Sequence, residues 1–234
     1  MSEIRAELAI VSSHIGLPGE PSAVIVLARQ VEGFRPPNVD RSYPVKWFCR
    51  LYLADAARFD GSESAESVIT AMADRFHDQR FELAVRRAAI ANLNGQDNLI
   101  PVMRPHRMSF LNVTITDSKE TVNSPTITSI PKTALVSCLA HTVAKDRFRI
   151  VSRVEELMSI SGSLNTLALK APKRRAPALA DEDEETPEDP ISLALQYAVW
   201  LSEIRMPWYD DRLAMKAEIM DFDYNPLAQG GRDD

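Results

Sequence analysis

Hydrophobic and polar positions follow a strand-like pattern over the first fifty residues. Segment 7–53 contains short apolar runs, among them Ala23–Ala28 and Val45–Leu53, that are rich in β-branched and aromatic residues. Such runs favour β-strands. The consecutive prolines in segment 35–40 predict a loop, because proline cannot continue the hydrogen bonds of a sheet. We therefore expect the two runs to pair as antiparallel strands on either side of a long loop.

Beyond residue 61, the spacing of the apolar residues becomes that of a helix. Ser62 or Ser64 can cap a helix that runs to about Gln79, with acidic residues in its first turn. The apolar and alanine positions of segment 81–93 predict a second helix. Asn94–Gly95 would end that helix, because glycine accepts the left-handed backbone of a C-terminal cap.

The second half of the body mixes both patterns. Segment 99–130 returns to residues typical of strands, with period-two alternation over Met108–Ile115. Pro131 precedes a helical pattern over 132–145, and segment 148–169 is consistent with one more helix. The predicted order of elements is β-β-α-α-β-α-α, with no internal repeat. Helices grouped between strands favour an α+β fold rather than a doubly wound α/β fold.

Segment 170–190 is the clearest boundary in the sequence. Basic residues and prolines come first, and the acidic run Asp181–Glu185 follows. Such a segment buries too little apolar surface to offset the entropy of ordering. We therefore predict three parts: a globular α+β body over 1–169, a charged flexible linker over 170–190, and a C-terminal docking helix with a tail over 191–234.

The helix predicted after this linker is apolar on most of its circumference. Asp189 is its expected N-cap and Pro190 its first residue, and the helical pattern runs over 191–204. A helix this apolar must pack on something, which leaves the body of the chain and another subunit as the two candidates. The candidate interaction residues are Leu195, Val199, Trp200 and Trp208.

Charge is divided unevenly along the chain. The net charge is -6, but residues 1–169 hold 19 Lys and Arg against 18 Asp and Glu, so the acidity lies in the last third. Arginine outnumbers lysine 15 to 4 in this body, and its planar guanidinium suits phosphate recognition. The arginines either form a groove for a phosphate backbone or are scattered over the surface. The candidate nucleic-acid-binding residues are Arg75, Arg80, Arg86, Arg87, Arg104, Arg107, Arg147, Arg149 and Arg153.

Motifs for catalysis are missing from the sequence. It contains no glycine-rich phosphate loop, no dinucleotide-binding fingerprint and no Gly-x-Ser-x-Gly elbow, so we predict no catalytic residue and no cofactor. Cys138 and His141 stand three residues apart in a predicted helix, where they could share a metal, but two ligands do not make a site. We therefore expect packing there and predict no metal site.

The remaining histidines carry weaker signals. His77 lies beside two aspartates of a predicted helix, which is more typical of a solvated surface than of a catalytic pair. His106 lies in an arginine-flanked loop where a phosphate contact is conceivable. His14 has no polar partner that the sequence identifies, and it supports no hypothesis.

The compartment follows from what the sequence lacks. The two cysteines stand 89 positions apart with no motif around either, which suits a reducing compartment. The N-terminal segment has acidic residues where a secretory signal has basic ones, and no apolar stretch reaches the length of a membrane-spanning helix. We expect a cytoplasmic protein with no membrane partner.

Three classes of function fit these observations. The first is a non-enzymatic assembly protein, coat- or nucleoprotein-like, that self-associates through its C-terminal helix and contacts nucleic-acid phosphates. The second is a regulatory or adaptor module, and the third is an enzyme with an unrecognised, dispersed site. The first class explains both the linker and the apolar helix. It therefore predicts a non-enzyme that forms homo-oligomers and binds single-stranded nucleic acid.

Overall fold

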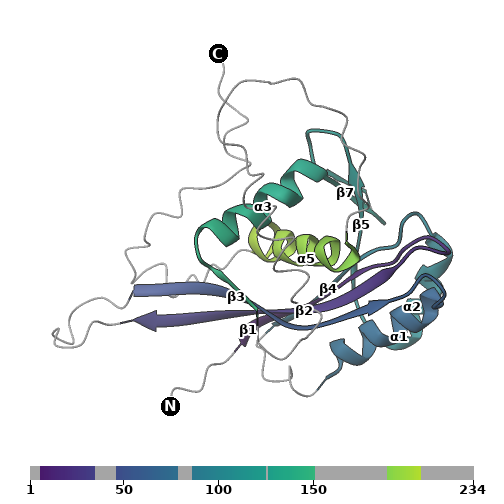
Figure 1. The fold of residues 1–234 in the computed structure, drawn as a ribbon, viewed down its shortest axis with the longest axis horizontal. Helices are drawn as coiled ribbons and strands as arrows, with labels where there is room; N and C mark the ends of the chain where they lie inside the picture. The colour runs from purple at the N-terminus through teal and green to yellow at the C-terminus, as the bar shows by residue number, and fades with distance from the viewer. Residues whose placement is uncertain (1–5, 35–45, 79–85, 125, 151–188, 207–234) are drawn as a thin grey trace.

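The described residues form one mixed sheet with helices on both faces (Figure 1). The computed structural model describes residues 6–34, 46–78, 86–124, 126–150 and 189–206. The strands are β1 (Ala6–His14), β2 (Ser22–Phe34), β3 (Lys46–Phe59), β4 (Arg86–Asn92), β5 (Leu111–Thr116), β6 (Val122–Asn123), β7 (Thr128–Pro131) and β8 (Phe148–Ile150). The α-helices are α1 (Ala65–Phe76), α2 (Ile100–Met103), α3 (Lys132–Ala144) and α5 (Pro190–Trp200), joined by 3-10 turns at Asp97–Leu99 and Arg104–His106 and a π-helical turn at Leu201–Arg205.

The sheet has the strand order β6-β7-β5-β4-β1-β2-β3-β8. Strands β1, β4, β5 and β7 pair in parallel, whereas β2 is antiparallel to both of its neighbours, β1 and β3. An eight-stranded mixed sheet with helices confirms the predicted α+β class. The parallel arrangement brings the carboxyl ends of β1 and β4 to the same edge of the sheet.

Elements with a strong local signal were predicted correctly. Strands β2 and β3 pair antiparallel, as the two apolar runs indicated. Helix α1 has Ser64 as its N-cap, whose side chain accepts a hydrogen bond from the main-chain N–H of Ser67. Helix α3 matches the pattern over 132–145. These elements depend on patterns and caps that lie within a few residues of each other.

The helix predicted over 81–93 is wrong, because residues 86–92 form strand β4. This strand lies between β1 and β5, where its alanines are covered on both faces. Alanine has a weak preference for strands, so sheet pairing and burial override the local propensity. Residues 148–150 likewise form β8 in place of the start of a helix. The linker segment up to residue 188 lies outside the described residues, so the three-part domain division stays a prediction.

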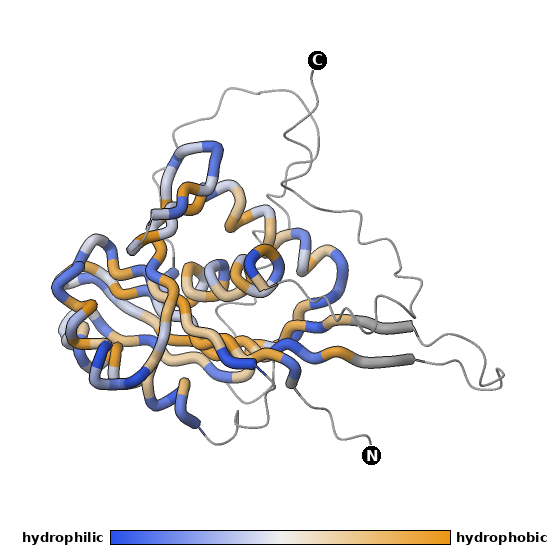
Figure 2. Tube along the Cα trace, turned by 180° about the vertical axis from the view of Figure 1, so that it is seen from behind, coloured by the Kyte–Doolittle hydropathy of each residue, from blue (hydrophilic) through white to orange (hydrophobic). Residues whose placement is uncertain are grey.

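Alternation along β1 separates two hydrophobic clusters, one on each face of the sheet. Leu8 and Ile10 point toward α5 and α3, whereas Val11 and Ile15 point toward α1 and α2. Figure 2 shows hydrophobic residues running along the central strands of the sheet. The sheet therefore separates an α5 face from an α1 face, and even-numbered positions of β1 face α5.

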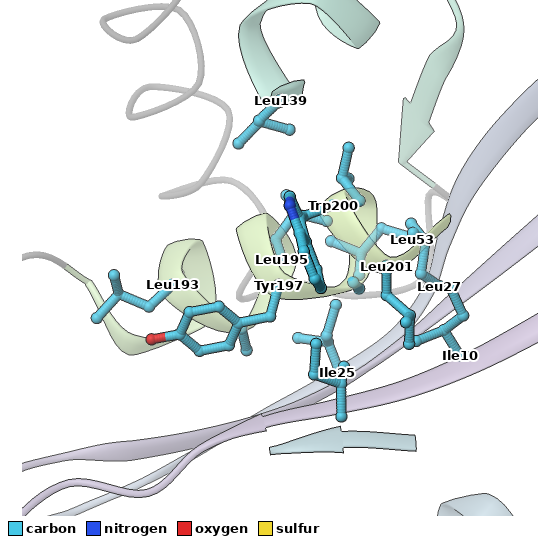
Figure 3. Packing of buried hydrophobic residues seen from close by; sticks show 14 of the residues in the cluster. Ile10, Ile25, Leu27, Leu53, Leu139, Leu193, Leu195, Tyr197, Trp200 and Leu201 are labelled. Atoms are coloured by element: carbon cyan, nitrogen blue, oxygen red, sulfur yellow. The ribbon is translucent and has the colours of Figure 1, made fainter. Parts of the chain in front are cut away.

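Helix α5 is buried within its own chain. Asp189 caps it by accepting a hydrogen bond from the Ser192 N–H, and Pro190 occupies the first turn, as predicted. Every residue from Pro190 to Trp200 is buried. Figure 3 shows Trp200 between Leu139 of α3 and the side chains of the sheet. Of the two candidate surfaces for this helix, it therefore packs on the body of the chain.

Charged side chains hold the C-terminal end of this helical segment. Arg29 of β2 is 1% exposed, forms an ion pair with Glu7 and donates to the Ser202 carbonyl oxygen at 2.9 Å. Arg147 donates to both carboxylate oxygens of Glu203 at 2.9 and 3.0 Å. Fork-to-fork pairs of this kind fix orientation as well as position. Neither α5 nor any other described helix is long and apolar enough to cross a membrane.

Candidate functional site

Polar side chains meet at the carboxyl ends of β1 and β4, on the α5 face of the sheet. His14 is the last residue of β1, and Asn92 is the last residue of β4. The parallel register places these two residues directly opposite each other. Ser12, two residues before His14, donates to the Ala194 carbonyl oxygen of α5 at 2.6 Å, so this row of side chains faces that helix.

Tyr197 of α5 joins the two strand ends. Its hydroxyl oxygen lies 3.2 Å from His14 Nδ1 and accepts a hydrogen bond from Asn92 Nδ2 at 2.9 Å. The imidazole and phenol rings lie 6.2 Å apart between centroids. The three side chains of this cluster (His14, Asn92 and Tyr197) come from positions up to 183 residues apart.

Burial sets the charge of the cluster. Asn92 is 2% exposed and Tyr197 is fully buried, whereas His14 is partly exposed. Burial lowers the pKa of His14 to about 4, although the nearby Glu20 carboxylate raises it. The imidazole is therefore neutral at physiological pH, because the protonated ring would lose its hydration. A neutral imidazole keeps one N–H donor and one acceptor nitrogen.

Two loops tied together form the rim of the cluster. Asn94 Nδ2 donates to the Ile15 carbonyl oxygen at 2.8 Å, and Gln96 Nε2 donates to the Gly16 carbonyl oxygen at 3.0 Å. Asn94 takes a left-handed backbone with φ of 48°, in the turn that follows β4. These bonds join the loop after β1 to the loop after β4, so the strand ends hold a fixed geometry.

The chemistry of the cluster is hydrogen bonding and proton transfer. It contains an imidazole, a phenol and a carboxamide, with the Glu20 carboxylate close to the imidazole. Within the described part of the chain, no three His, Cys, Asp or Glu side chains are grouped so as to hold a metal ion. Ligands of open α/β sheets bind beyond the carboxyl ends of the strands, which is where these side chains lie.

The predicted arginines lie at separate places. Arg75, Arg87, Arg104 and Arg107 belong to α1, β4 and the turn after α2, whereas Arg147 and Arg149 lie at β8, on the far side of β1, β2 and β3. Arg86, at the start of β4, lies 4.0 Å from Glu7. Arg80 and Arg153 lie outside the described residues.

Several of these arginines already have protein partners. Arg75 forms an ion pair with Asp55, and Arg149 forms one with Asp146. Arg87 donates to the Phe76 carbonyl oxygen at 3.1 Å, which fastens β4 to the end of α1. Phosphate binding by the predicted arginines stays a prediction, and the exposed side chains of Arg104 and Arg107 are the clearest positions for it.

The other candidate histidines and the cysteine have structural contacts. His77 Nε2 lies 2.8 Å from the His106 carbonyl oxygen, which joins α1 to the turn after α2. Cys138 packs beside α5, and burial raises the pKa of its thiol to about 12. Burial, together with Lys145 and Arg147, lowers the pKa of His141. The packing expected for Cys138 agrees with this environment.

Three of the four predicted interaction residues lie within the described part of the chain, and all three are buried. Leu195 and Val199 are fully buried and Trp200 is 2% exposed, so these three side chains contact the rest of the chain. Arg205 lies over the Trp200 ring, with its guanidinium carbon 5.8 Å from the centroid. Trp208 lies outside the described residues.

Sequence patterns did not identify the three residues of the cluster as functional. His14 ends an apolar run, which is a signal for a side chain at a strand end. Asn92 was assigned to a helix, so its position opposite His14 was hidden. Tyr197 stands in an apolar helix, where an aromatic residue indicates core packing. A sequence pattern reports local periods, whereas this cluster depends on sheet register and on the docking of α5.

Comparisons with known proteins give one likeness of fold. No protein-family model matches the sequence, and no curated protein matches it. A solved structure described as "Human cytomegalovirus terminase nuclease domain, Mn soaked, inhibitor bound" is similar over 94% of this chain and 90% of that chain, with a TM-score of 0.49 and 8% sequence identity. At that identity and TM-score, the likeness assigns no activity to this chain.

The interpretation as a coat- or nucleoprotein-like assembly protein is wrong. It assigned self-association to the C-terminal helix, whereas α5 is buried against the sheet and α3 of its own chain. The apolar circumference of α5 is explained by the fold itself, because the helix completes the hydrophobic core on one face of the sheet.

Proposed function

We propose that this protein is an enzyme whose reactive groups come from distant parts of the sequence and meet at the carboxyl ends of β1 and β4. The observation that carries the proposal is the contact of His14 Nδ1 with the Tyr197 hydroxyl, 3.2 Å apart, next to Asn92. In this arrangement the buried Tyr197 hydroxyl orients the partly exposed imidazole, and Asn92 in turn orients the hydroxyl. Such a chain of side chains is typical of acid–base and hydrogen-bond catalysis.

His14 is the group that we expect to contact the substrate. Its pKa of about 4 keeps the ring uncharged at neutral pH. A neutral imidazole polarises a substrate oxygen by donating a hydrogen bond, or transfers a proton, without first losing a charge. Tyr197 and Asn92 are buried behind the ring, so their role is to hold it.

Other expectations stay predictions beside this proposal. Contact with single-stranded nucleic acid, a homo-oligomeric state and a cytoplasmic location rest on the sequence alone. The regulatory or adaptor interpretation also stays a prediction, and a protein that turns over no substrate would favour it.

The test is turnover by the purified full chain. The substrates are a chromogenic phosphodiester, a chromogenic carboxylic ester, and short single-stranded RNA and DNA. For any substrate that is turned over, we expect His14→Gln to lower kcat/KM by about 100-fold or more, the range of a lost acid–base group. His77→Gln is the matched control, since it removes an exposed imidazole on the other face of the sheet, and it should leave kcat/KM unchanged.

Two outcomes would overturn the proposal. Equal kcat/KM for the wild type and His14→Gln would remove His14 from the reaction. A folded wild-type protein that turns over none of the four substrates would make the adaptor interpretation the better one.

A further inference from the structure

The Asn92 side chain has a defined orientation. Its Oδ1 accepts a hydrogen bond from the Asn94 main-chain N–H at 2.9 Å. A main-chain N–H can only donate, so the oxygen of the carboxamide must lie on that side. The amide nitrogen therefore points toward the Tyr197 hydroxyl, to which it donates at 2.9 Å.

The orientation of Asn92 limits what the Tyr197 hydroxyl can do. The phenol oxygen accepts from Asn92 Nδ2, and its O–H group can itself donate to an acceptor within reach. His14 Nδ1 lies 3.2 Å from this oxygen. If the phenol donates to Nδ1, that nitrogen is the acceptor of the ring, and the proton of a neutral imidazole must then lie on Nε2.

The second nitrogen of the His14 ring is Nε2. The two nitrogens of an imidazole point in divergent directions, so Nε2 points away from the buried Tyr197 hydroxyl. Among the described residues, Nε2 has no hydrogen-bond partner within the protein, and His14 is partly exposed. The titratable and polar groups around the ring are Tyr197 from α5, Asn92 from β4 and the Glu20 carboxylate from the loop after β1.

We propose that Asn92 and Tyr197 are positioning residues that hold His14 as its Nε2–H tautomer, so that the site presents an N–H donor to an acceptor atom of the substrate. The tautomer is a property of the folded chain, and its use toward a substrate rests on the proposed function. The proposal makes α5 part of the site, because the helix supplies the hydroxyl that selects the tautomer.

The experiment is long-range proton–nitrogen correlation NMR on the full-length chain labelled with ¹⁵N, at neutral pH. The His14 signals are assigned by their loss in His14→Gln. We expect Nε2 to appear as a protonated nitrogen and Nδ1 as an unprotonated one. In Tyr197→Phe, which keeps the ring and removes the hydroxyl, the ratio of the two tautomers should fall by about fivefold, the equivalent of one net hydrogen bond.

The controls keep the result interpretable. The signals of exposed His77 in the same spectra should not change in Tyr197→Phe, because that residue lies near α1 and not near α5. Asn92→Ser keeps a polar group with less reach, and we expect it to weaken the same tautomer preference. If Tyr197→Phe fails to fold, the wild-type spectrum alone decides.

The outcomes separate this inference from the proposed function. A wild-type His14 that is protonated on Nδ1, or a tautomer ratio unchanged in Tyr197→Phe, would overturn the positioning role whatever the activity. An Nε2–H tautomer together with full activity of His14→Gln would leave the positioning role intact and overturn the catalytic one.

Discussion

Buried polar side chains in this protein are matched by partners on other elements. Ser12 and Ser13 of β1 are both fully buried, and they point to opposite faces of the sheet. Ser12 donates to the Ala194 carbonyl oxygen of α5, and Ser13 contacts Met72 Sδ of α1. A buried hydroxyl without a partner costs stability, so each contact also selects the register of the helix above it. His14 lies on the same face of the sheet as Ser12, but it ends the strand and is partly exposed to solvent.

The pH dependence of stability should report the burial of His14. In the unfolded chain its imidazole takes up a proton near pH 6.5, whereas in the folded chain it stays neutral down to about pH 4. The unfolded state then binds more protons between these values, so stability falls as the pH is lowered from 6.5 to 4. The loss attributable to this residue is on the order of 3 kcal/mol.

Urea unfolding at a series of pH values checks this prediction. Burial also lowers the pKa of His141, so the wild-type curve alone does not isolate one residue. His14→Gln should flatten the dependence in this window. A His14→Gln curve parallel to that of the wild type would contradict the buried, neutral state of His14.

Gly61 is a second position where a single residue decides the local structure. A Cβ there would lie 2.2 Å from the Gly19 carbonyl oxygen, in the loop that follows His14. Gly19 itself has a φ of 94°, so this backbone has little room to adapt. We expect Gly61→Ala to lower the free energy of unfolding by about 1–3 kcal/mol and to shift the His14 ring signals. Ser62→Ala, at the exposed neighbouring position, should change neither quantity.

At the scale of elements, α5 is a buried helix that fills the hydrophobic cluster on one face of the sheet. Tyr197 and Trp200 are among the largest fully buried side chains, and both project from this helix into the cluster between the sheet and α3 (Figure 3). The helix is held at its start by the ion pair of Asp189 with Arg58, 3.2 Å apart. At its end, Arg29 and Arg147 contact the turn that follows it. The helix is therefore a core element of the sheet domain.

Shortening Trp200 should weaken this core. Trp200→Ala leaves a cavity between α3 and the sheet, and we expect the free energy of unfolding to fall by about 3–5 kcal/mol. Leu17→Ala is the matched control, because Leu17 is 46% exposed, and it should change stability by less than about 0.5 kcal/mol. A Trp200→Ala protein as stable as the wild type would mean that α5 contributes little to the fold in solution.

At the scale of the whole molecule, the two ends of the described chain share one hydrophobic core. The cluster on the α5 face contains residues of β1, β2 and β3 together with residues of α5. The opposite face is covered by α1 and α2 (Figure 1). Because the central strands are buried on both sides, undocking either layer of helices from the sheet would expose apolar surface.

This shared core predicts that α5 and the sheet unfold together. In native-state hydrogen exchange, the amides of Leu195 and Val199 should open with the same free energy as those of Ile10 and Ile25. Loss of protection in α5 at low denaturant, while β1 and β2 stay protected, would contradict this prediction and would make the helix a separate unit.

The extent to which the sequence alone predicts this protein depends on how far apart the interacting residues lie. The apolar runs of β2 and β3, the Ser64 cap of α1 and the Asp189 cap of α5 are encoded within a few neighbouring residues, so their patterns were sufficient. Strand β4 was missed because its alanines become a strand only when β1 and β5 pair with them.

The sequence by itself determined the α+β class and the starts of helices α1, α3 and α5, because hydrophobic period, capping and turn chemistry act locally. Tertiary structure alone decided that α5 packs on its own chain and that His14, Asn92 and Tyr197 meet. Those contacts join residues 105 and 183 positions apart. They follow from the parallel register of β1 with β4 and from burial of the α5 face, which no local period records.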